Sequence, residues 1–292
     1  MKKIQLTKDR WIGEGEPLFI IAEIGNNHNG NLQIAFELIK KAKEAGADAV
    51  KFQVKDIELA FDKESLDKPY SGPNSFGKTY REHKLALEFS ENQIKEVYQF
   101  AKKINIICFA TPFDVNSVEL LERIGNPIYK ISSFHVTDLN LIEKIAKINK
   151  PILMSTGMST IKEIETAVNL IRKYTDKIAL FQCTSCYPTD DKDVNLRVIP
   201  ALKNRFNCPV GFSGHERGTS ISVAAVALDA CMIEKHFTLD RTMKGPDHAS
   251  SVEPIGLKSI ADRIKKIFDA LGSEEKYVLD CELNNRKKFR GY

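Results

Sequence analysis

The chain has 292 residues, of which 42% are hydrophobic and 28% charged, and its formal net charge is +4. That length suits one large α/β domain or two small ones, and that composition supports a sizeable core and excludes a disordered chain. The mild charge, of mixed sign throughout, predicts no nucleic acid binding and is compatible with an anionic small substrate.

The sequence also predicts a cytoplasmic protein that does not enter a membrane. No apolar segment approaches the roughly 20 residues that a membrane span needs, and "MKKIQLTKDRW" lacks the apolar core of a signal peptide. The six cysteines are scattered, several within apolar runs, which indicates a reduced protein without a disulfide framework. Cys183 and Cys186 form a CxxC, but Pro188 follows closely in what reads as a strand entering a loop, so a redox or zinc role is disfavoured.

Short apolar runs alternate with segments of helical periodicity almost from end to end. Each run has the length of a strand, and most are bounded by Gly, Pro, Asn or Asp. The predicted strands are 19–24, 48–53, 105–110, 127–132, 151–156, 178–183, 209–214 and 231–236. The predicted helices are 31–47, 91–104, 115–124, 138–148, 160–174, 195–206, 218–230 and 255–272. Asp138 and Thr160 are candidate caps of two helices.

This alternation predicts an α/β fold, a (β/α)8 TIM barrel. A doubly wound open sheet is the alternative, but "EIGNNHNGN" lacks the GxGxxG turn that would usually follow its first strand. Two segments fall outside the repeat. Residues 1–18 are expected to form a short hairpin that caps the barrel bottom. Residues 54–90 form a long loop after strand two, which we expect to act as a lid over the site.

Nearly every predicted strand ends in a polar or charged side chain. Active sites of such barrels lie at these C-terminal strand ends. Because an unpaired buried charge is costly, a ring of these residues at one end indicates chemistry rather than packing. The residues are Glu23, Lys51, Gln53, Thr111, Lys130, Ser132, Ser133, Ser155, Thr156, Gln182, Thr184, Ser185, Ser213, His215, Glu234, Lys235 and His236.

Two histidines lie at neighbouring strand ends, and a carboxylate follows them. Adjacent strands lie about 4.8 Å apart, so His215 and His236 are predicted to reach one ion, with Asp247 on the following loop. Imidazole and carboxylate ligands suit a divalent ion such as Mn²⁺, Zn²⁺ or Fe²⁺. The alternative is a pair of hydrogen-bonded structural histidines.

Two lysines accompany a group of hydroxyls at the same end. Lys51 and Lys130 are predicted to hold an anion, helped by hydroxyl donors from Thr111, Ser133, Ser155 and Ser213. The alternative, which is compatible with the first, is that each lysine neutralises a carboxylate such as Glu23 or Glu234.

Six motifs in chain order resemble the sialic acid synthases, the N-acetylneuraminate synthase family. The similarity runs from about Arg10 to about Gly272 and is closest to the branch with the animal-type enzymes. The motifs are "FIIAEIGNNHNG", "GADAVKFQ", "STGM", "CTSCYP", "GFSGHERG" and "IEKHFTLDRTMKGPDHASSVEP".

The resemblance implies a barrel that condenses phosphoenolpyruvate with an N-acylated hexosamine aldehyde, N-acetylmannosamine or its 6-phosphate, to give a nonulosonic acid plus phosphate. It implies a divalent metal, Mn²⁺ or Mg²⁺, held by His215 and His236. Glu23, Asp247, Lys51 and Lys130 are the expected catalytic residues. The expected phosphoenolpyruvate contacts are Lys51, Thr111, Lys130, Ser133, Ser155, Ser185, Tyr187 and Ser213. The expected sugar contacts are Gln53, His135, Asp247 and His83.

Three features depart from the family. His135 stands where relatives carry an acid that contacts the sugar, and Phe134 beside it resembles the legionaminic and pseudaminic acid branches. The aldose is therefore either a different sugar or the usual one held by a single hydrogen bond. Ser185 replaces an Asn of many members. We expect a NeuB-type synthase barrel over residues 1–280 and a tail over 281–292, without the antifreeze-like (SAF) domain of relatives.

The expected partners follow from the same resemblance. They are the two small-molecule substrates and a second copy of the chain in a homodimer. The antifreeze-like domain either belongs to a longer form of the chain, or is supplied as a separate protein, or is not needed by this enzyme. Two rival functions remain open. Another metal-dependent barrel aldolase or hydrolase would explain the histidines and Asp247 but would not need both lysines and the hydroxyls. A non-catalytic sugar-binding barrel is suggested by His135 and the absent domain.

Overall fold

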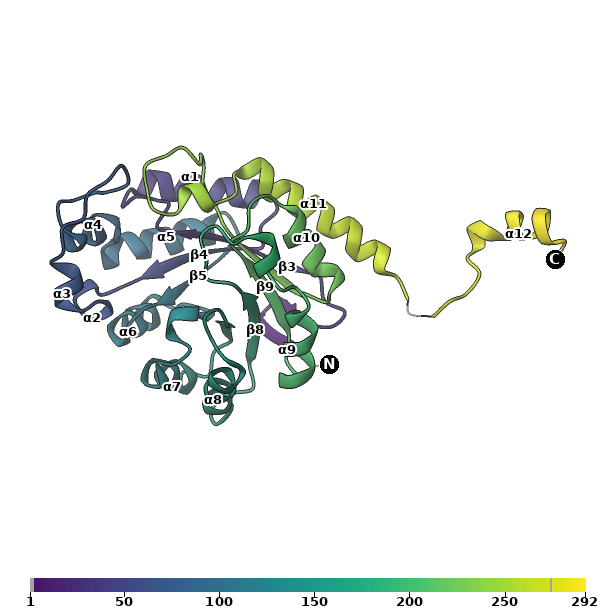
Figure 1. Cartoon of the computed structure of the whole chain (residues 1–292), viewed down its shortest axis with the longest axis horizontal. Coiled ribbons are helices and arrows are strands. Elements are labelled where there is room, and N and C mark those ends of the chain that lie inside the picture. Colours follow the sequence, from purple (N-terminus) through teal and green to yellow (C-terminus); the bar gives the residue numbers. More distant parts are fainter. Residues whose placement is uncertain (1–2, 274) are drawn as a thin grey trace.

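The structure, a computed structural model, describes residues 3–273 and 275–292. Parallel strands close into a barrel in the order β10-β3-β4-β5-β6-β7-β8-β9, and helices surround it (Figure 1). The chain therefore keeps its sequence order around the barrel, and its last strand closes against its first. The predicted (β/α)8 TIM barrel is confirmed, and the open doubly wound sheet is excluded.

The barrel strands are short and almost wholly buried, because side chains pack on both faces of a parallel sheet. This is why they read as continuous apolar runs in the sequence. The strands are β3 Phe19–Gly25, β4 Ala49–Val54, β5 Ile107–Pro112, β6 Tyr129–Ile131, β7 Ile152–Ser155, β8 Ile178–Cys183, β9 Val210–Gly214 and β10 Met232–His236.

The outer helices present an apolar face to the barrel, and several begin at a side-chain cap. The Thr160 side chain accepts from the Glu163 amide and Glu163 reaches back, while Asp138 accepts from the Leu141 amide, so both predicted caps are confirmed. The helices are α1 Leu32–Glu44, α5 Glu91–Lys103, α6 Val115–Ile124, α7 Leu139–Lys147, α8 Ile161–Arg172, α9 Val198–Phe206, α10 Ser220–Ala227 and α11 Pro254–Leu271.

An N-terminal hairpin closes the bottom of the barrel, as predicted. Strands β1 Ile4–Thr7 and β2 Arg10–Ile12 pair antiparallel. Their buried side chains join the cluster inside the barrel that contains Phe19 and Ala49, the first residues of two strands. The bottom is thus filled with apolar side chains, and the polar strand ends lie at the opposite rim.

The long segment after β4 folds into three short helices, α2 Ile57–Ala60, α3 Lys63–Leu66 and α4 Tyr80–Leu87. It meets the loop after β10 at the rim, where the Gly245 amide donates to Asn74 Oδ1 at 3.3 Å and Lys244 Nζ lies 4.6 Å from the Phe76 ring centroid. The segment thus reaches the mouth of the barrel. That it opens and closes as a lid stays a prediction.

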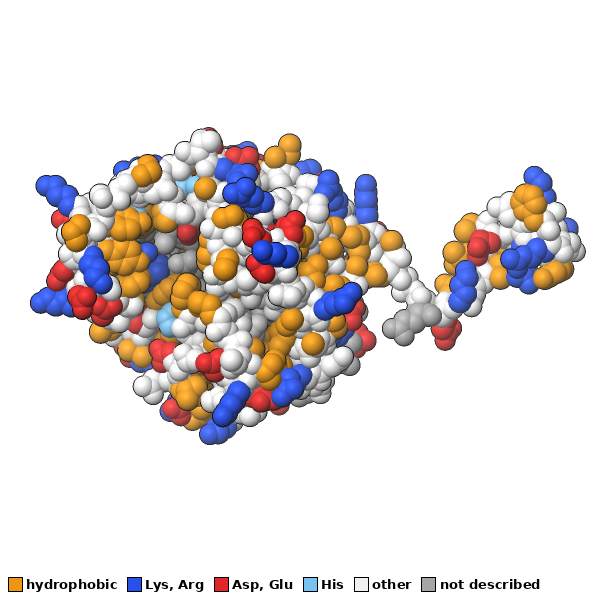
Figure 2. All heavy atoms as spheres, in the orientation of Figure 1, with side chains coloured by type: hydrophobic (Ala, Val, Ile, Leu, Met, Phe, Trp, Pro, Cys, Tyr) orange, Lys and Arg blue, Asp and Glu red, His pale blue; other side chains and the backbone are white. Residues whose placement is uncertain are grey.

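The C-terminal segment leaves the barrel after α11. Helix α12, Leu283–Arg290, stands apart from the barrel in Figure 1, and its residues are exposed or nearly so. The expected boundary between residues 280 and 281 falls inside the short 3-10 helix Asp280–Glu282. Positive and negative side chains are interspersed over the barrel face seen in Figure 2. No helix among the described residues is long and apolar enough to cross a membrane.

We expect Ile12→Ala to destabilise the fold. Ile12 is fully buried in the cluster that closes the barrel bottom, so truncation removes its contacts and leaves a cavity. The expected loss in the free energy of unfolding is about 2–5 kcal/mol. Urea unfolding measures it, with Ile255→Ala as control because Ile255 is 81% exposed. Equal stability of the two variants would contradict the role of the hairpin.

Candidate active site

A cavity opens at the carboxyl ends of the barrel strands, and nearly every strand contributes to it. This is the rim at which active sites of such barrels lie. Its lining residues are Glu23, Lys51, Gln53, Thr111, Phe113, Lys130, Ser132, Ser133, Phe134, Ser155, Cys183, Tyr187, Ser213, His215, Glu234 and His236.

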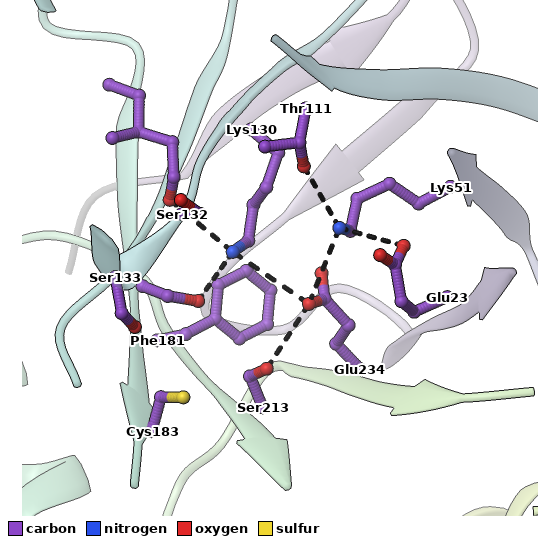
Figure 3. A network of polar contacts seen from close by, with 12 residues as sticks. Glu23, Lys51, Thr111, Lys130, Ser132, Ser133, Phe181, Cys183, Ser213 and Glu234 are labelled. Carbon is purple, nitrogen blue, oxygen red and sulfur yellow. Dashed lines mark hydrogen bonds and ion pairs between the residues drawn. The ribbon is translucent and has the colours of Figure 1, made fainter. Parts of the chain in front are cut away.

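The centre of the cavity is a buried network of two lysines and two glutamates (Figure 3). Lys51 Nζ lies 2.8 Å from Glu23 Oε2 and 3.0 Å from Thr111 Oγ1. Glu234 Oε1 lies 3.8 Å from Lys51 Nζ and 3.8 Å from Lys130 Nζ, so Glu234 bridges the two cations. The expectation that the lysines neutralise Glu23 and Glu234 is therefore confirmed.

Hydroxyl groups complete the network. Lys130 Nζ donates to Ser155 Oγ at 2.5 Å, and Ser213 Oγ donates to Glu234 Oε1 at 3.2 Å. Strand register explains the Ser213–Glu234 and Glu23–Lys51 contacts, because these residues pair on adjacent strands. Paired residues point to the same side of a sheet, so each pair enters the barrel together.

Burial and charge act against one another on these groups. Burial opposes ionisation of Glu234, but the charges of Lys130 and Lys51 prevail and lower the pKa of Glu234. Burial would lower the pKa of Lys51, but Glu23 and Glu234 raise it. Burial lowers the pKa of Lys130, which Glu234 offsets only in part. Glu234 thus stays ionised. Of the two lysines, Lys130 has the positive charge that nearby carboxylates stabilise less.

The two predicted metal histidines meet at the edge of the cavity. The ring centroids of His215 and His236 lie 5.5 Å apart, and the Tyr187 ring lies 4.0 Å from that of His215. Burial, and then the charge of His236, lower the pKa of His215 to about 3, so this imidazole is neutral at pH 7. Its Nδ1 lies 2.9 Å from the Thr184 carbonyl oxygen, which can only accept, so Nδ1 carries the proton and Nε2 has a free lone pair.

His236 lies beside the predicted third acid. Its Nδ1 is 3.9 Å from Asp247 Oδ2, and this buried nitrogen has no hydrogen-bond partner among the described residues. Within the described parts of the chain, no group of three or more His, Cys, Asp and Glu side chains is arranged to hold a metal. The protein groups here therefore amount to two imidazoles with a carboxylate nearby.

Glu23, Gln53 and Asp247 converge on Gly25. Gln53 Nε2 donates to Glu23 Oε1 at 2.9 Å. A Cβ on Gly25 would lie 3.2 Å from Gln53 Nε2, 3.3 Å from Glu23 Oε1 and 3.4 Å from Asp247 Oδ2. These three predicted residues are thus brought together, at a position where glycine also permits the backbone φ of +53°.

The remaining predicted contacts divide between the cavity and its surroundings. Ser185 lies beside the lining residue Ser133, because a Cβ on Gly157 would be 2.3 Å from Ser185 Oγ and 2.8 Å from Ser133 Oγ. His135 Nδ1 lies 2.7 Å from Ser132 Oγ, and its ring meets the edge of Phe113 with centroids 5.0 Å apart. Burial lowers the pKa of His135.

His83 lies on α4 rather than in the cavity wall. It is buried, and its ring centroid lies 4.5 Å from that of Tyr70. The Phe76 amide points to its Nδ1 at 3.3 Å. Burial and then Lys84 and Lys244 lower the pKa of His83 to about 4, so it is a neutral part of the folded segment. A direct sugar contact by His83 stays a prediction.

The structure gives places in the site to residues to which the sequence assigned no catalytic or binding role, although Glu234 and Ser132 were among the polar strand ends. Glu234 lies at the centre of the lysine network. Its place at a strand end identified it as a polar rim residue but not as the residue that bridges both lysines. Ser132, Phe113, Phe134 and Cys183 also line the cavity. Phe113 follows β5 and Cys183 ends β8, and both positions look apolar in the sequence, so no local signal distinguishes them from core residues.

A barrel whose strand ends bring paired lysines, glutamates, hydroxyls and histidines into one cavity is the architecture of an enzyme. The NeuB family model matches residues 38–276 of the chain. The chain thus belongs to the NeuB family, the sialic-acid-synthase type, and the predicted resemblance is confirmed.

Similarity to named relatives extends over almost the whole chain. The chain is 41% identical over 287 residues to the N-acetylneuraminate-9-phosphate synthase of Homo sapiens, covering 98% of this chain and 80% of that protein. It is 44% identical over 272 residues to the N,N'-diacetyllegionaminic acid synthase of Campylobacter jejuni, covering 91% and 81%. The structure of an N-acetylneuraminic acid (sialic acid) synthetase from Leptospira borgpetersenii matches with a TM-score of 0.86 at 33% identity, covering 100% of this chain and 98% of that one.

We expect Glu234→Gln to lower the pKa of Lys130. Burial lowers the pKa of Lys130 and the Glu234 charge raises it, so removing that charge leaves the effect of burial less opposed. NMR titration of the lysine Cε resonances measures the shift. The control is Glu122→Gln, because Glu122 pairs with the half-exposed Lys150 outside the cavity. A pKa of Lys130 that stays constant in Glu234→Gln would contradict the bridging role.

Proposed function

We propose that the enzyme condenses phosphoenolpyruvate with the open-chain aldehyde of an N-acylated hexosamine, N-acetylmannosamine or its 6-phosphate. The product is a nonulosonic acid, and phosphate is released. The observation that carries the proposal is the pair of fully buried lysines, bridged by Glu234 and ringed by hydroxyls, at the mouth of the barrel. A barrel aldolase or hydrolase with a neutral substrate has no need of two buried cations.

The lysines and hydroxyls suit the anionic groups of phosphoenolpyruvate. Lys51 and Lys130 carry the positive charge, and the Thr111 and Ser155 hydroxyls, which accept from these lysines, can donate to phosphate or carboxylate oxygens. The formal charges of Lys51, Lys130, Glu23 and Glu234 cancel, however. A strongly anionic substrate is therefore held best when a further cation joins the site.

The two histidines fit a divalent ion, Mn²⁺ or Mg²⁺. His215 is neutral, and its Nδ1–H donates to the Thr184 carbonyl, the arrangement that orients an imidazole for metal binding. His236 has a buried Nδ1 without a hydrogen-bond partner in the described chain, next to Asp247. Such an ion would supply Lewis-acid polarisation of the aldehyde oxygen.

The protein groups position the reactants and a water molecule. The C2=C3 double bond of phosphoenolpyruvate opens as C3 forms a bond to the aldehyde carbon, whose carbonyl oxygen becomes a hydroxyl. Water adds at C2 and loses a proton, which balances the proton gained by that oxygen, and the C–O bond to phosphate breaks. Glu23 orients or deprotonates that water, since Gln53 and Lys51 fix its carboxylate at the cavity wall, and Asp247 is the second candidate. Lys51 and Lys130 stabilise the phosphate and carboxylate charges throughout, which is mainly positioning and electrostatics.

A second candidate function is the synthesis of a related nonulosonate of the legionaminic or pseudaminic type. The observation that favours it is His135 at the cavity edge, where Ser132 and Phe113 hold it. Because burial lowers the pKa of this imidazole, it offers a sugar a neutral hydrogen-bonding group in place of a carboxylate. A homodimer and a separate antifreeze-like domain stay predictions.

The experiment that tests the function measures phosphate release from phosphoenolpyruvate in the presence of Mn²⁺. The aldoses offered are N-acetylmannosamine, its 6-phosphate and a 2,4-diacetamido-trideoxy hexose. We expect release that depends on one aldose and is lost in Lys130→Met and His236→Ala. Lys150→Met, which changes a surface lysine, is the matched control. Folded enzyme that binds Mn²⁺ yet releases no phosphate with any aldose would contradict the proposal.

We expect the KM for phosphoenolpyruvate to rise at alkaline pH. Because the pKa of Lys130 lies below the ordinary lysine value of 10.5, its charge is lost as pH rises through that lowered pKa. In Glu234→Gln the same rise should begin at lower pH, since the supporting carboxylate is gone. Initial rates from neutral to alkaline pH measure this, and a rise in KM that begins at the same pH in Glu234→Gln as in wild type would contradict it.

A further inference from the structure

A second buried ion pair lies on the outer wall of the barrel, directly behind the two histidines. Lys235 lies between Glu234 and His236 on β10, and successive strand residues point to opposite faces, so it points away from the cavity. Lys235 Nζ lies 2.9 Å from Glu216 Oε1 and donates to the Glu216 carbonyl oxygen at 2.7 Å. The Lys235 and Glu216 side chains are 1% and 0% exposed.

Glu216 is held from several sides. Ser222 Oγ, at the start of α10, donates to Glu216 Oε1 at 2.9 Å. Glu216 forms a parallel bridge with Thr189, whose amide donates to the His215 carbonyl oxygen at 3.1 Å. The carboxylate also lies close over Gly214, because a Cβ there would be 2.2 Å from Glu216 Oε2.

These contacts join four segments at one point: the end of β9, β10, the loop after β8 and α10. An apolar pair would fill the same space without the cost of desolvating two charges, so packing alone does not require an ion pair here. The ion pair instead provides contacts that require a defined geometry. One ammonium group binds both the side chain and the main chain of Glu216, which sets the position of the β9 end relative to β10.

The residues tied together are the chain neighbours of the two imidazoles, since His215 precedes Glu216 and His236 follows Lys235. We propose that the Lys235–Glu216 ion pair is a positioning device that sets the separation and orientation of His215 and His236, and thereby the affinity for the divalent ion. This inference rests on the proposed function, in which those histidines bind the ion.

The test is Mn²⁺ binding to the variant Lys235→Met/Glu216→Gln, which removes both charges, keeps the side-chain volumes and leaves no unpaired buried carboxylate. Free Mn²⁺ is measured by electron paramagnetic resonance on enzyme without substrate. Because partners behind metal ligands tune affinity by about 10-fold to 100-fold, we expect the Kd for Mn²⁺ to rise by about 10-fold or more. At saturating Mn²⁺, kcat should recover towards the wild-type value, because on this proposal the ion pair acts through occupancy of the metal site and neither residue touches substrate.

The control is Lys203→Met/Asp229→Asn, which makes the same kind of change in a more exposed ion pair, with a 2.8 Å separation, outside the cavity. It should leave the Kd for Mn²⁺ unchanged even if it lowers the Tm. Should the double variant fail to fold, Glu216→Gln alone keeps an oxygen for Lys235 and should still raise the Kd, by less than the double variant would.

Three outcomes are distinguishable. A raised Kd with an unaltered control supports the positioning role. An unaltered Kd in folded variants, with wild-type binding that is lost in His236→Ala, overturns this inference and leaves the proposed function intact. Wild-type enzyme that binds no Mn²⁺ overturns both.

Discussion

The site depends on one buried carboxylate that lies between two buried cations. Two lysines in one cavity repel each other, and burial disfavours the charge on each. Glu234 lies 3.8 Å from both ammonium groups and so allows both to remain charged at the end of a barrel filled with apolar side chains. Glu23 lies 2.8 Å from Lys51 and raises its pKa strongly but has only a minor effect on Lys130, which is why the two lysines differ in the direction of their pKa shifts. The asymmetry leaves Lys130 the more responsive of the two to the charge of a bound anion.

Most of the barrel could be predicted from the sequence because parallel strands are buried on both faces. Each predicted strand matches an observed one, with ends that differ by two residues at most. The rim residues followed from the same logic, since the polar residue that ends each apolar run must lie at the carboxyl end of its strand. Glu234 was identifiable as polar but not as the bridge, because bridging depends on which strands close the barrel and on their register. Phe113 and Cys183 could not be separated from core residues by any local pattern.

The structure of the segment between residues 54 and 90 could not be predicted from the sequence. Its length, aromatic residues and glycines indicated a functional loop, but they did not predict its short helices. His83 resembled a ligand contact in the sequence. In the structure it is buried against the half-buried rings of Tyr70, Phe76 and Tyr80, and this aromatic cluster explains its position without a ligand. The ring contacts of His83 join it to residues up to 13 positions away, so they depend on how the segment folds back on itself rather than on strand periodicity.

Strand β10 explains why an apolar run ends in an acid, a base and an imidazole. Glu234 points into the cavity and bridges the lysines, Lys235 points to the outer wall and binds Glu216, and His236 returns to the cavity beside His215. A register slip of one residue would turn each β10 side chain to the other face of the sheet. Lys235 would then enter the cavity beside Lys51 and Lys130, and Glu234 would be buried at the outer wall. Either misplaced charge would lose its partner in a buried environment, so the wrong register is strongly disfavoured. The polar residues that serve the site therefore also fix the register in which the barrel closes, and the geometry of the site and the closure of the fold are stabilised by the same contacts.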